Sequence, residues 1–424
     1  MKFWKIVFAV FFMILMGGFG NLRAQKILIP MDLTQTDHLK AYGVAYWTLE
    51  RNINVEWLLN YRGGSFLTDY YPEIERELRL RGVSFEKIGG PEVAQIYSTI
   101  QSNNMDVVLL EKAPKIAVYT PPNKRPWDDA VTLALTYAEI PYTKIWDAEV
   151  AHGDLEKYDW LHLHHEDFTG QYGKFYASFR NAPWYIEDVR RNEAMARKLG
   201  FKKVSEEKKF IARIIQDFVR RGGFLFAMCS ATDTIDIALA AQNVDIVPAV
   251  FDGDPPDPNY RAKLDYSKTF AFTNFRLELN PYVYEYSDID IPPSYAAPLK
   301  GPEAEAFTLF DFSAKYDQVP TMLTQDHVNI IKGFMGQTTA FNRKRIKPYV
   351  TILGEVPGTD MVKYIHGNLG KGTFTFLGGH DPEDYQHAVG DPPTQLSLHR
   401  NSPGYRLILN NVLFPAAKKK KQKT

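Results

Sequence analysis

The sequence predicts an α/β protein with a parallel sheet flanked by helices, an N-terminal βαβ lobe and a Pro/aromatic-rich insertion. Short apolar runs alternate with helical patterns of about 10 to 15 residues, which is typical of parallel β–α–β units. Several of these runs are followed by residues that can do chemistry, at the strand ends where such sheets bind ligands. The 424-residue chain is 45% hydrophobic and 14% aromatic, which is enough to bury a large core.

The first residues have the pattern of an export signal. Lys2 and Lys5 precede an apolar stretch over 6–16, and the pattern ends at a cleavage-type sequence closing with Ala24. The apolar stretch is shorter than the roughly 20 residues that span a bilayer. We therefore expect an exported protein, periplasmic or extracellular, with no transmembrane segment after signal removal.

The charges of the folded part are mildly acidic. The chain has 50 basic and 50 acidic residues, but three basic residues belong to the signal and five lysines to the tail, which leaves 42 basic against 50 acidic. An acidic body is a poor match to nucleic acid. We expect a small-molecule, glycan or peptide ligand and no nucleic acid. The lysine tail is either simply solvated or attaches the protein to acidic polymers.

Composition and pattern divide the chain into six parts. They are a signal peptide at 1–24, an N-terminal α/β lobe at 25–113, a first sheet part at 114–250, an insertion at 251–320, a second sheet part at 321–415 and a basic tail at 416–424.

The N-terminal lobe begins with a β–α–β pattern. The predicted elements are strand 26–30, helix 38–49 and strand 55–61. The second strand ends at Arg62, followed by Gly63, Gly64 and Ser65. Paired glycines beside a cation can bring backbone amides to an anionic ligand, or can simply form a tight turn. We predict that Arg62 and Ser65 contact substrate.

The sheet pattern continues in two parts. The first predicts strand 115–119, helix 128–138, strands 143–146 and 158–165, helix 206–220 and strand 224–226. The segment 251–320 is rich in proline and aspartate and predicts loops and short antiparallel strands over the sheet edge. The second part predicts a return of the parallel pattern at strand 350–353, a hairpin over 364–372 and strand 373–377.

Cys229 is the single cysteine, and it lies between the strand at 224–226 and a helix predicted at 233–240. A helix N-terminus lowers the pKa of a thiol and favours the reactive thiolate. Free cysteine is also among the residue types most often buried. Cys229 is therefore either a nucleophile or a core residue, and a lone cysteine forms no intramolecular disulfide.

Histidines and acids end the strand predicted at 158–165. Residues two apart on a strand share one face about 7 Å apart, so His162 and His164 pair there, and neutral imidazoles suit zinc. A polar network at the strand end and contact with substrate are the alternatives to metal. We predict no metal and no cofactor, and substrate contacts from His164, His165, Glu166 and Asp167.

The last predicted strand runs into Gly378-Gly379-His380, with Glu383 just behind. Together with the turn at Cys229, this ending resembles the class I glutamine amidotransferase-like fold, a flavodoxin-like parallel sheet. The resemblance implies that Cys229 is a nucleophile, His380 its general base and Glu383 the orienting carboxylate.

The match to the amidotransferase motif has departures. Ala227 and Ala231 stand where the usual elbow has glycines, and Asp381 and Pro382 both separate the histidine from Glu383. This spacing resembles the trehalose-utilisation-like branch of the superfamily, whose members generally keep the fold without the amidotransferase triad.

The whole chain also resembles a family of exported Bacteroidetes proteins labelled asparagine synthetase B, through segments 57–66 and 165–173. Synthetases of that name expose a cysteine after methionine removal, whereas Lys2 stands here. They bind ATP through Ser-Gly-Gly-x-Asp-Ser, and the nearest stretch, 230–234, lacks both glycines. We do not expect asparagine synthesis.

Two functions follow from these residues. The first is an exported cysteine-dependent hydrolase of amides or related carbonyl compounds, which requires a partly exposed Cys229 in electropositive surroundings. The alternative is a non-catalytic carbohydrate- or peptide-binding module on the same fold, which requires a buried thiol and a groove lined by aromatic rings.

Overall fold

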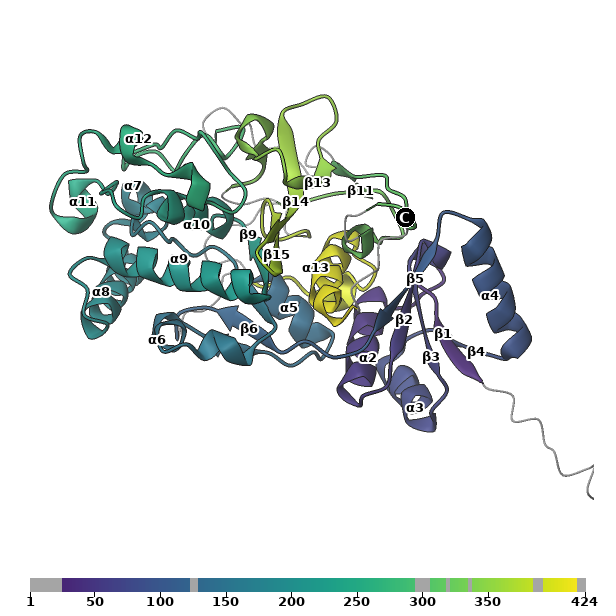
Figure 1. Ribbon diagram of the computed structural model, residues 1–424. Helices are drawn as coiled ribbons and strands as arrows, with labels where there is room; N and C mark the ends of the chain where they lie inside the picture. The colour runs from purple at the N-terminus through teal and green to yellow at the C-terminus, as the bar shows by residue number, and fades with distance from the viewer. Residues whose placement is uncertain are drawn as a thin grey trace, which may run out of the picture.

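The computed structural model describes residues 25–122, 129–293, 306–317, 321–334, 338–383 and 392–417, and the predicted signal peptide and most of the basic tail lie outside them. The described residues form two sheets, one of five strands and one of ten, with helices packed against them (Figure 1). The prediction of an α/β protein is confirmed, and its large sheet contains both parallel and antiparallel strands. No described helix has both the length and the apolar character needed to cross a membrane.

The N-terminal lobe is built on the five-stranded sheet. Its elements are β1 (Lys26–Ile29), α2 (His38–Glu50), β2 (Val55–Leu59), β3 (Ser65–Asp69), α3 (Pro72–Arg81), β4 (Glu86–Ile88), α4 (Gly90–Ser102) and β5 (Asp106–Leu110). The strand order is β4-β1-β3-β2-β5, and every pair is antiparallel. The predicted β1-α2-β2 order is therefore present, with β3 inserted between the two strands. Asp37 starts α2 by accepting a 2.9 Å hydrogen bond from the Lys40 amide.

The ten-stranded sheet begins with parallel strands. The elements of this half are β6 (Ile116–Tyr119), α5 (Ala130–Tyr137), β7 (Thr143–Ile145), α6 (Asp147–Ala151), β8 (Trp160–Leu163), α7 (Tyr176–Phe179), α8 (Pro183–Lys198), α9 (Val204–Arg221), β9 (Phe224–Met228) and α10 (Ala231–Ala240). The four strands of this half and β15 (Gly372–Leu377) are parallel and lie in the order β7-β6-β8-β9-β15. In chain order these strands run 2-1-3-4-5, so the order reverses between β6 and β8.

The remaining strands are antiparallel. They are β10 (Phe307–Leu309), β11 (Ile330–Ile331), β12 (Phe341–Asn342), β13 (Thr351–Glu355) and β14 (Met361–Leu369). The prediction that the parallel pattern returns at 350–353 is wrong, because β13 pairs antiparallel with β14, and β14 antiparallel with β15. The turn at Gly370 and Lys371 has only two residues, and such a short turn joins antiparallel neighbours. The insertion contributes the short helices α11 (Ala249–Asp252) and α12 (Tyr260–Lys263).

A C-terminal helix, α13 (Pro403–Leu413), joins the two sheets and lies between the N-terminal lobe and the main sheet (Figure 1). Its Arg406 side chain is fully buried. The guanidinium donates hydrogen bonds to the Tyr42 hydroxyl at 3.0 Å, to the Met31 carbonyl at 2.9 Å and to the Gly63 carbonyl. One buried cation from the C-terminal helix thus holds backbone and side chain of the N-terminal lobe.

Candidate functional site

The carboxyl ends of β8, β9 and β15 meet at one edge of the main sheet. The strands are in register, with Leu163 beside Ala227 and Leu377 beside Met228. Beyond the strands, the Cys229 amide donates to the Gly379 carbonyl at 3.1 Å. The predicted positions of the polar residues at a common sheet edge are therefore correct.

A cavity of about 430 Å³ lies beyond the ends of β6 and β8, where the strand order reverses. Ligands of open α/β sheets bind in this position, because the crossover helices leave in opposite directions and open a crevice. Three of the predicted substrate-binding residues, His165, Glu166 and Asp167, line it. The lining also includes Pro121, Trp146, Gly170, Tyr172, Gly173, Phe175, Trp184, Glu187, Asp188, Arg191, Asn192, Val204 and Lys208.

Aromatic rings from three segments of the chain form part of the cavity wall. Trp146 precedes α6, Trp184 begins α8, and Tyr172 and Phe175 come from the loop after β8. The rings of Phe175 and Trp184 meet edge to face, with centroids 5.7 Å apart. Sequence reasoning missed these rings as site residues. Trp184 reaches the cavity through the packing of α8, whereas Trp146 directly follows β7 and could have been found from its place at a strand end.

The carboxylate of Asp167 holds the loop after β8 in place. It accepts hydrogen bonds from the amides of Thr169 at 2.7 Å, Gln171 at 2.8 Å and Gly173 at 3.0 Å. Gly173 has a φ of +73°, and a Cβ there would lie 2.5 Å from the Phe175 ring, so the turn requires glycine. Asp167 therefore shapes the cavity by fixing its loop.

A buried ion pair lies at the cavity wall. The Lys208 amine is 2.6 Å from the Asp147 carboxylate, which also accepts a hydrogen bond from the Tyr119 hydroxyl. Burial works against the charged amine, but the attraction of nearby acidic groups, Asp147 foremost, outweighs it, so the pKa of Lys208 is raised. Burial raises the pKa of Glu207 to about 8, although Lys208 acts in the opposite direction. One cation thus balances Asp147, and Glu207 keeps its proton near neutral pH.

Cys229 does not meet the requirement of the hydrolase hypothesis for a partly exposed thiol in electropositive surroundings. The residue is 2% exposed, and its φ of +50° places it at a sharp turn between β9 and α10. Burial raises the pKa of its thiol far above the ordinary value, and the carboxylates of Asp233 and Asp290 raise it further, against a hydrogen bond from Ser230. These surroundings disfavour the thiolate that a nucleophile needs.

The other two predicted triad residues, His380 and Glu383, each lie beside a histidine. The His380 ring lies 5.3 Å from the His164 ring, centroid to centroid. The Glu383 carboxylate forms an ion pair with His399 at 3.2 Å. Both residues follow β15, as predicted, and neither lines the cavity.

The predicted substrate contacts of Arg62 and Ser65 are not supported. The Arg62 guanidinium is occupied by ion pairs with Asp32 and Glu86, both at 2.7 Å. Ser65 is fully buried and donates to the Arg62 carbonyl at 3.2 Å. The paired glycines form a turn stabilised by these bonds.

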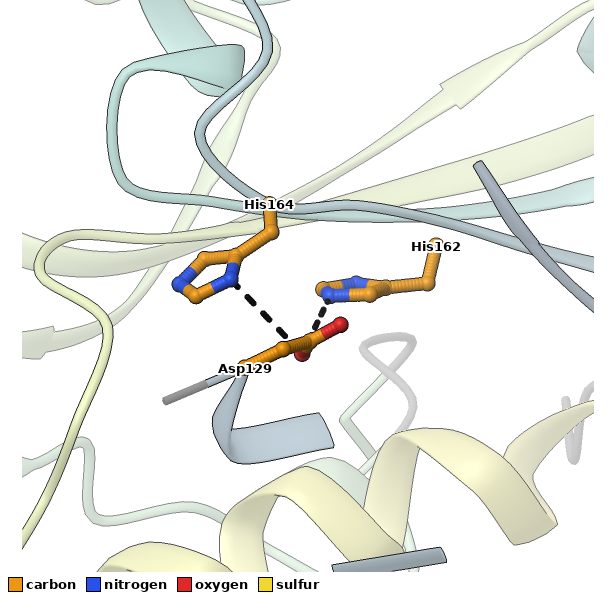
Figure 2. A group of neighbouring side chains, drawn as sticks. All are labelled: Asp129, His162 and His164. Carbon is orange, nitrogen blue, oxygen red and sulfur yellow. Dashed lines mark ion pairs between the residues drawn. The ribbon is translucent and has the colours of Figure 1, made fainter. Parts of the chain in front are cut away.

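His164 does not line the cavity but lies in a cluster with His162 and Asp129 (Figure 2). Asp129 precedes α5 and caps it, accepting from the Val131 amide at 3.0 Å. Burial lowers the pKa of His164 well below its ordinary value, and His165 acts in the same direction, so its imidazole is neutral. Sequence reasoning missed Asp129 as a site residue, although its place before an apolar helix marks a cap.

No protein-family model matches the chain, and neither does any curated protein. Two solved structures of cytoplasmic proteins from Salmonella typhimurium share 10% and 12% identity with it, with TM-scores of 0.34 and 0.35, over 72% of this chain and 100% of theirs. A GH42 β-galactosidase from G. stearothermophilus shares 12% identity, with a TM-score of 0.27, over 65% of this chain and 29% of its own.

Proposed function

We propose that the main sheet is a flavodoxin-like, amidotransferase-like fold that serves as a binding module for a carbohydrate ligand. The observation that carries the proposal is the cavity between the ends of β6 and β8, with its aromatic wall. The strand order 2-1-3-4-5 supports the fold, because flavodoxin-like sheets have this order and bind ligands where it reverses.

The chemistry of the cavity suits a sugar. Trp146 and Trp184 offer apolar rings to the C–H faces of a sugar ring, while the carboxylates of Glu166 and Glu187 accept hydrogen bonds from hydroxyl groups. On α8, the Arg191 guanidinium is paired with Asp188 at 3.2 Å and Glu187 at 3.3 Å, so one cation faces two carboxylates and this side keeps a net negative charge. A neutral polar ligand fits such a lining better than an anionic one, because carboxylates repel an anion.

Amide hydrolysis through Cys229 is the less favoured function, because the buried thiol lacks the exposure and the positive surroundings of a nucleophile. We keep as proposals the export of the protein and its kinship with the Bacteroidetes family labelled asparagine synthetase B. Export rests on the signal pattern of the first residues, and the kinship rests on sequence resemblance.

The proposal is tested by calorimetric titration of the full mature chain with a panel of mono- and oligosaccharides. Replacing Trp184 by alanine removes a ring from the cavity wall and should weaken binding about 10- to 100-fold. Trp47→Ala is the matched control, since Trp47 stacks on Arg51 in the N-terminal lobe, away from the cavity lining. The proposal would be contradicted if both variants lost saccharide binding equally, or if neither lost it.

A further inference from the structure

Three buried side chains from β8 and the start of α5 converge on one point (Figure 2). His162 and His164 project from the end of β8, and Asp129 lies at the start of α5. The Asp129 Oδ1 atom lies 3.3 Å from His162 Nε2 and 3.7 Å from His164 Nδ1. One possible ligand atom from each residue lies within 4.8 Å of the other two.

The longer separation matches a shared metal ion better than a direct hydrogen bond, whereas the 3.3 Å separation between His162 and Asp129 fits either. Zinc binds nitrogen and oxygen ligands at about 2.0–2.2 Å, so tetrahedral ligand atoms lie about 3.3–3.5 Å from each other. The distance of 3.7 Å between His164 Nδ1 and the carboxylate is too long for a hydrogen bond.

The hydrogen bond of His162 fixes which of its nitrogens faces the carboxylate without a proton. Its Nδ1 lies 3.1 Å from the Phe226 carbonyl, which can only accept, so Nδ1 carries the proton. With Nδ1 protonated, Nε2 of a neutral ring would direct its lone pair at an Asp129 oxygen, and two lone pairs repel unless a proton or a metal ion lies between them. Metal-binding histidines are oriented in this way by a carbonyl behind the ring.

The surroundings of His164 distinguish a metal site from a simple ion pair between His162 and Asp129. A protonated His162 would satisfy the carboxylate by itself, but it would leave His164 unexplained. His164 is 3% exposed, and neither of its ring nitrogens has a hydrogen-bond partner within the described part of the chain. Buried polar atoms without partners are rare, because they have lost water and gained nothing.

We propose that Asp129, His162 and His164 bind a divalent transition-metal ion of the zinc class. Two neutral imidazoles and one carboxylate are borderline ligands that suit zinc and its first-row neighbours and disfavour calcium or magnesium. Three protein ligands leave a further position for water or another ligand. The site is independent of the carbohydrate proposal, since none of its three ligands lines the cavity.

A second cluster, formed by three aspartates, already has a cation beside it. Asp245, Asp252 and Asp254 also lie close together, but the Lys203 amine forms ion pairs with all three. Their charge is already balanced by a lysine, which makes Asp254 a suitable control for adventitious binding to surface carboxylates.

The test uses the full mature chain, stripped with a chelator and titrated with Zn²⁺ by calorimetry and with Co²⁺ by visible absorption. We expect one ion per chain, and the ligand-field bands of Co²⁺ with nitrogen and oxygen ligands. His164→Ala and Asp129→Asn should each weaken Zn²⁺ binding by more than about 100-fold, beyond the effect of losing an outer partner. Asp254→Asn and His366→Asn should leave it unchanged, His366 being a buried histidine outside the cluster. Binding that survives both cluster variants, or that Asp254→Asn abolishes, would overturn the proposal.

A second measurement uses the unmodified protein, so it tests the proposal even where a variant fails to fold. Zinc added to the ¹⁵N-labelled chain should shift the Nε2 resonance of one histidine and the Nδ1 resonance of another, and it should raise the melting temperature. Shifts confined to the exposed His152, or no histidine shift at stoichiometric zinc, would overturn the assignment.

Discussion

Replacing Lys208 by methionine tests the buried ion pair beside the cavity. The amine and the Asp147 carboxylate are 2.6 Å apart, and their side chains are 6% and 0% exposed, so solvent screens them little. Removing one partner of such a pair leaves a buried charge uncompensated and costs about 3–5 kcal/mol. The hydrogen bond from Tyr119 to Asp147 remains, which places the expected loss near the lower end, about 3 kcal/mol.

The assay is urea unfolding of the variant beside two comparison proteins. The double variant Asp147→Asn/Lys208→Met carries no buried charge at this place, so we expect it to recover most of the lost stability. Lys112→Met removes a surface pair with Asp159, 3.4 Å apart and 68% and 40% exposed, and should cost at most about 1 kcal/mol. A loss below about 1 kcal/mol for Lys208→Met, or a double variant less stable than it, would refute the reasoning.

Three further predictions concern other buried groups. Because the fold raises the pKa of Glu207 from 4.5 to about 8, folding takes up a proton between these values. The free energy of unfolding should therefore fall as pH rises through that window, by up to about 1.4 kcal/mol per unit. Glu207→Gln should lack this slope when urea unfolding is measured from pH 5 to 8. Parallel plots of unfolding free energy against pH for the variant and the unmodified protein would contradict the prediction. Cys229, 2% exposed, should react with a thiol reagent only at the rate of unfolding, and fast labelling of the native chain would show the account of the thiol to be wrong. Arg406→Met should cost about 3–5 kcal/mol in thermal or urea unfolding, since it leaves the Met31 carbonyl and the Tyr42 hydroxyl without their buried donor, and a cost under about 1 kcal/mol would count against its role between the lobes.

The sequence predicts the parallel strands well because strands buried on both faces consist mainly of apolar residues. β6, β8 and β9 are buried along their whole length, and each is a short apolar run followed by polar residues. The helix α8 was missed, because only Tyr185 and Ala196 of its residues are buried and the apolar pattern is weak.

Part of the site follows from strand ends and part does not. His165 and Glu166 follow β8 directly, so their place beside a cavity can be predicted from strand logic. Trp184 and Lys208 reach the cavity through the packing of α8 and α9, which no local pattern encodes.

The surroundings of Cys229 could not be predicted from its turn. The position at the end of β9 is common to a nucleophile and a core residue, and the difference lies in what covers the thiol. Asp290, one of the carboxylates that raise its pKa, belongs to the insertion at 251–320, far along the chain. Long-range packing therefore decides the chemistry of this residue.

The most direct test of the central claim, that the cavity between β6 and β8 binds a carbohydrate, is ¹⁹F NMR of the chain labelled with fluorotryptophan. The sequence has seven tryptophans, of which Trp146 and Trp184 line the cavity. Titration with the saccharide that binds should shift the resonances of these two, assigned by Trp→Phe variants, and leave that of the buried Trp57 in place. Shifts at Trp47 or Trp57 with none at Trp146 and Trp184 would contradict the account.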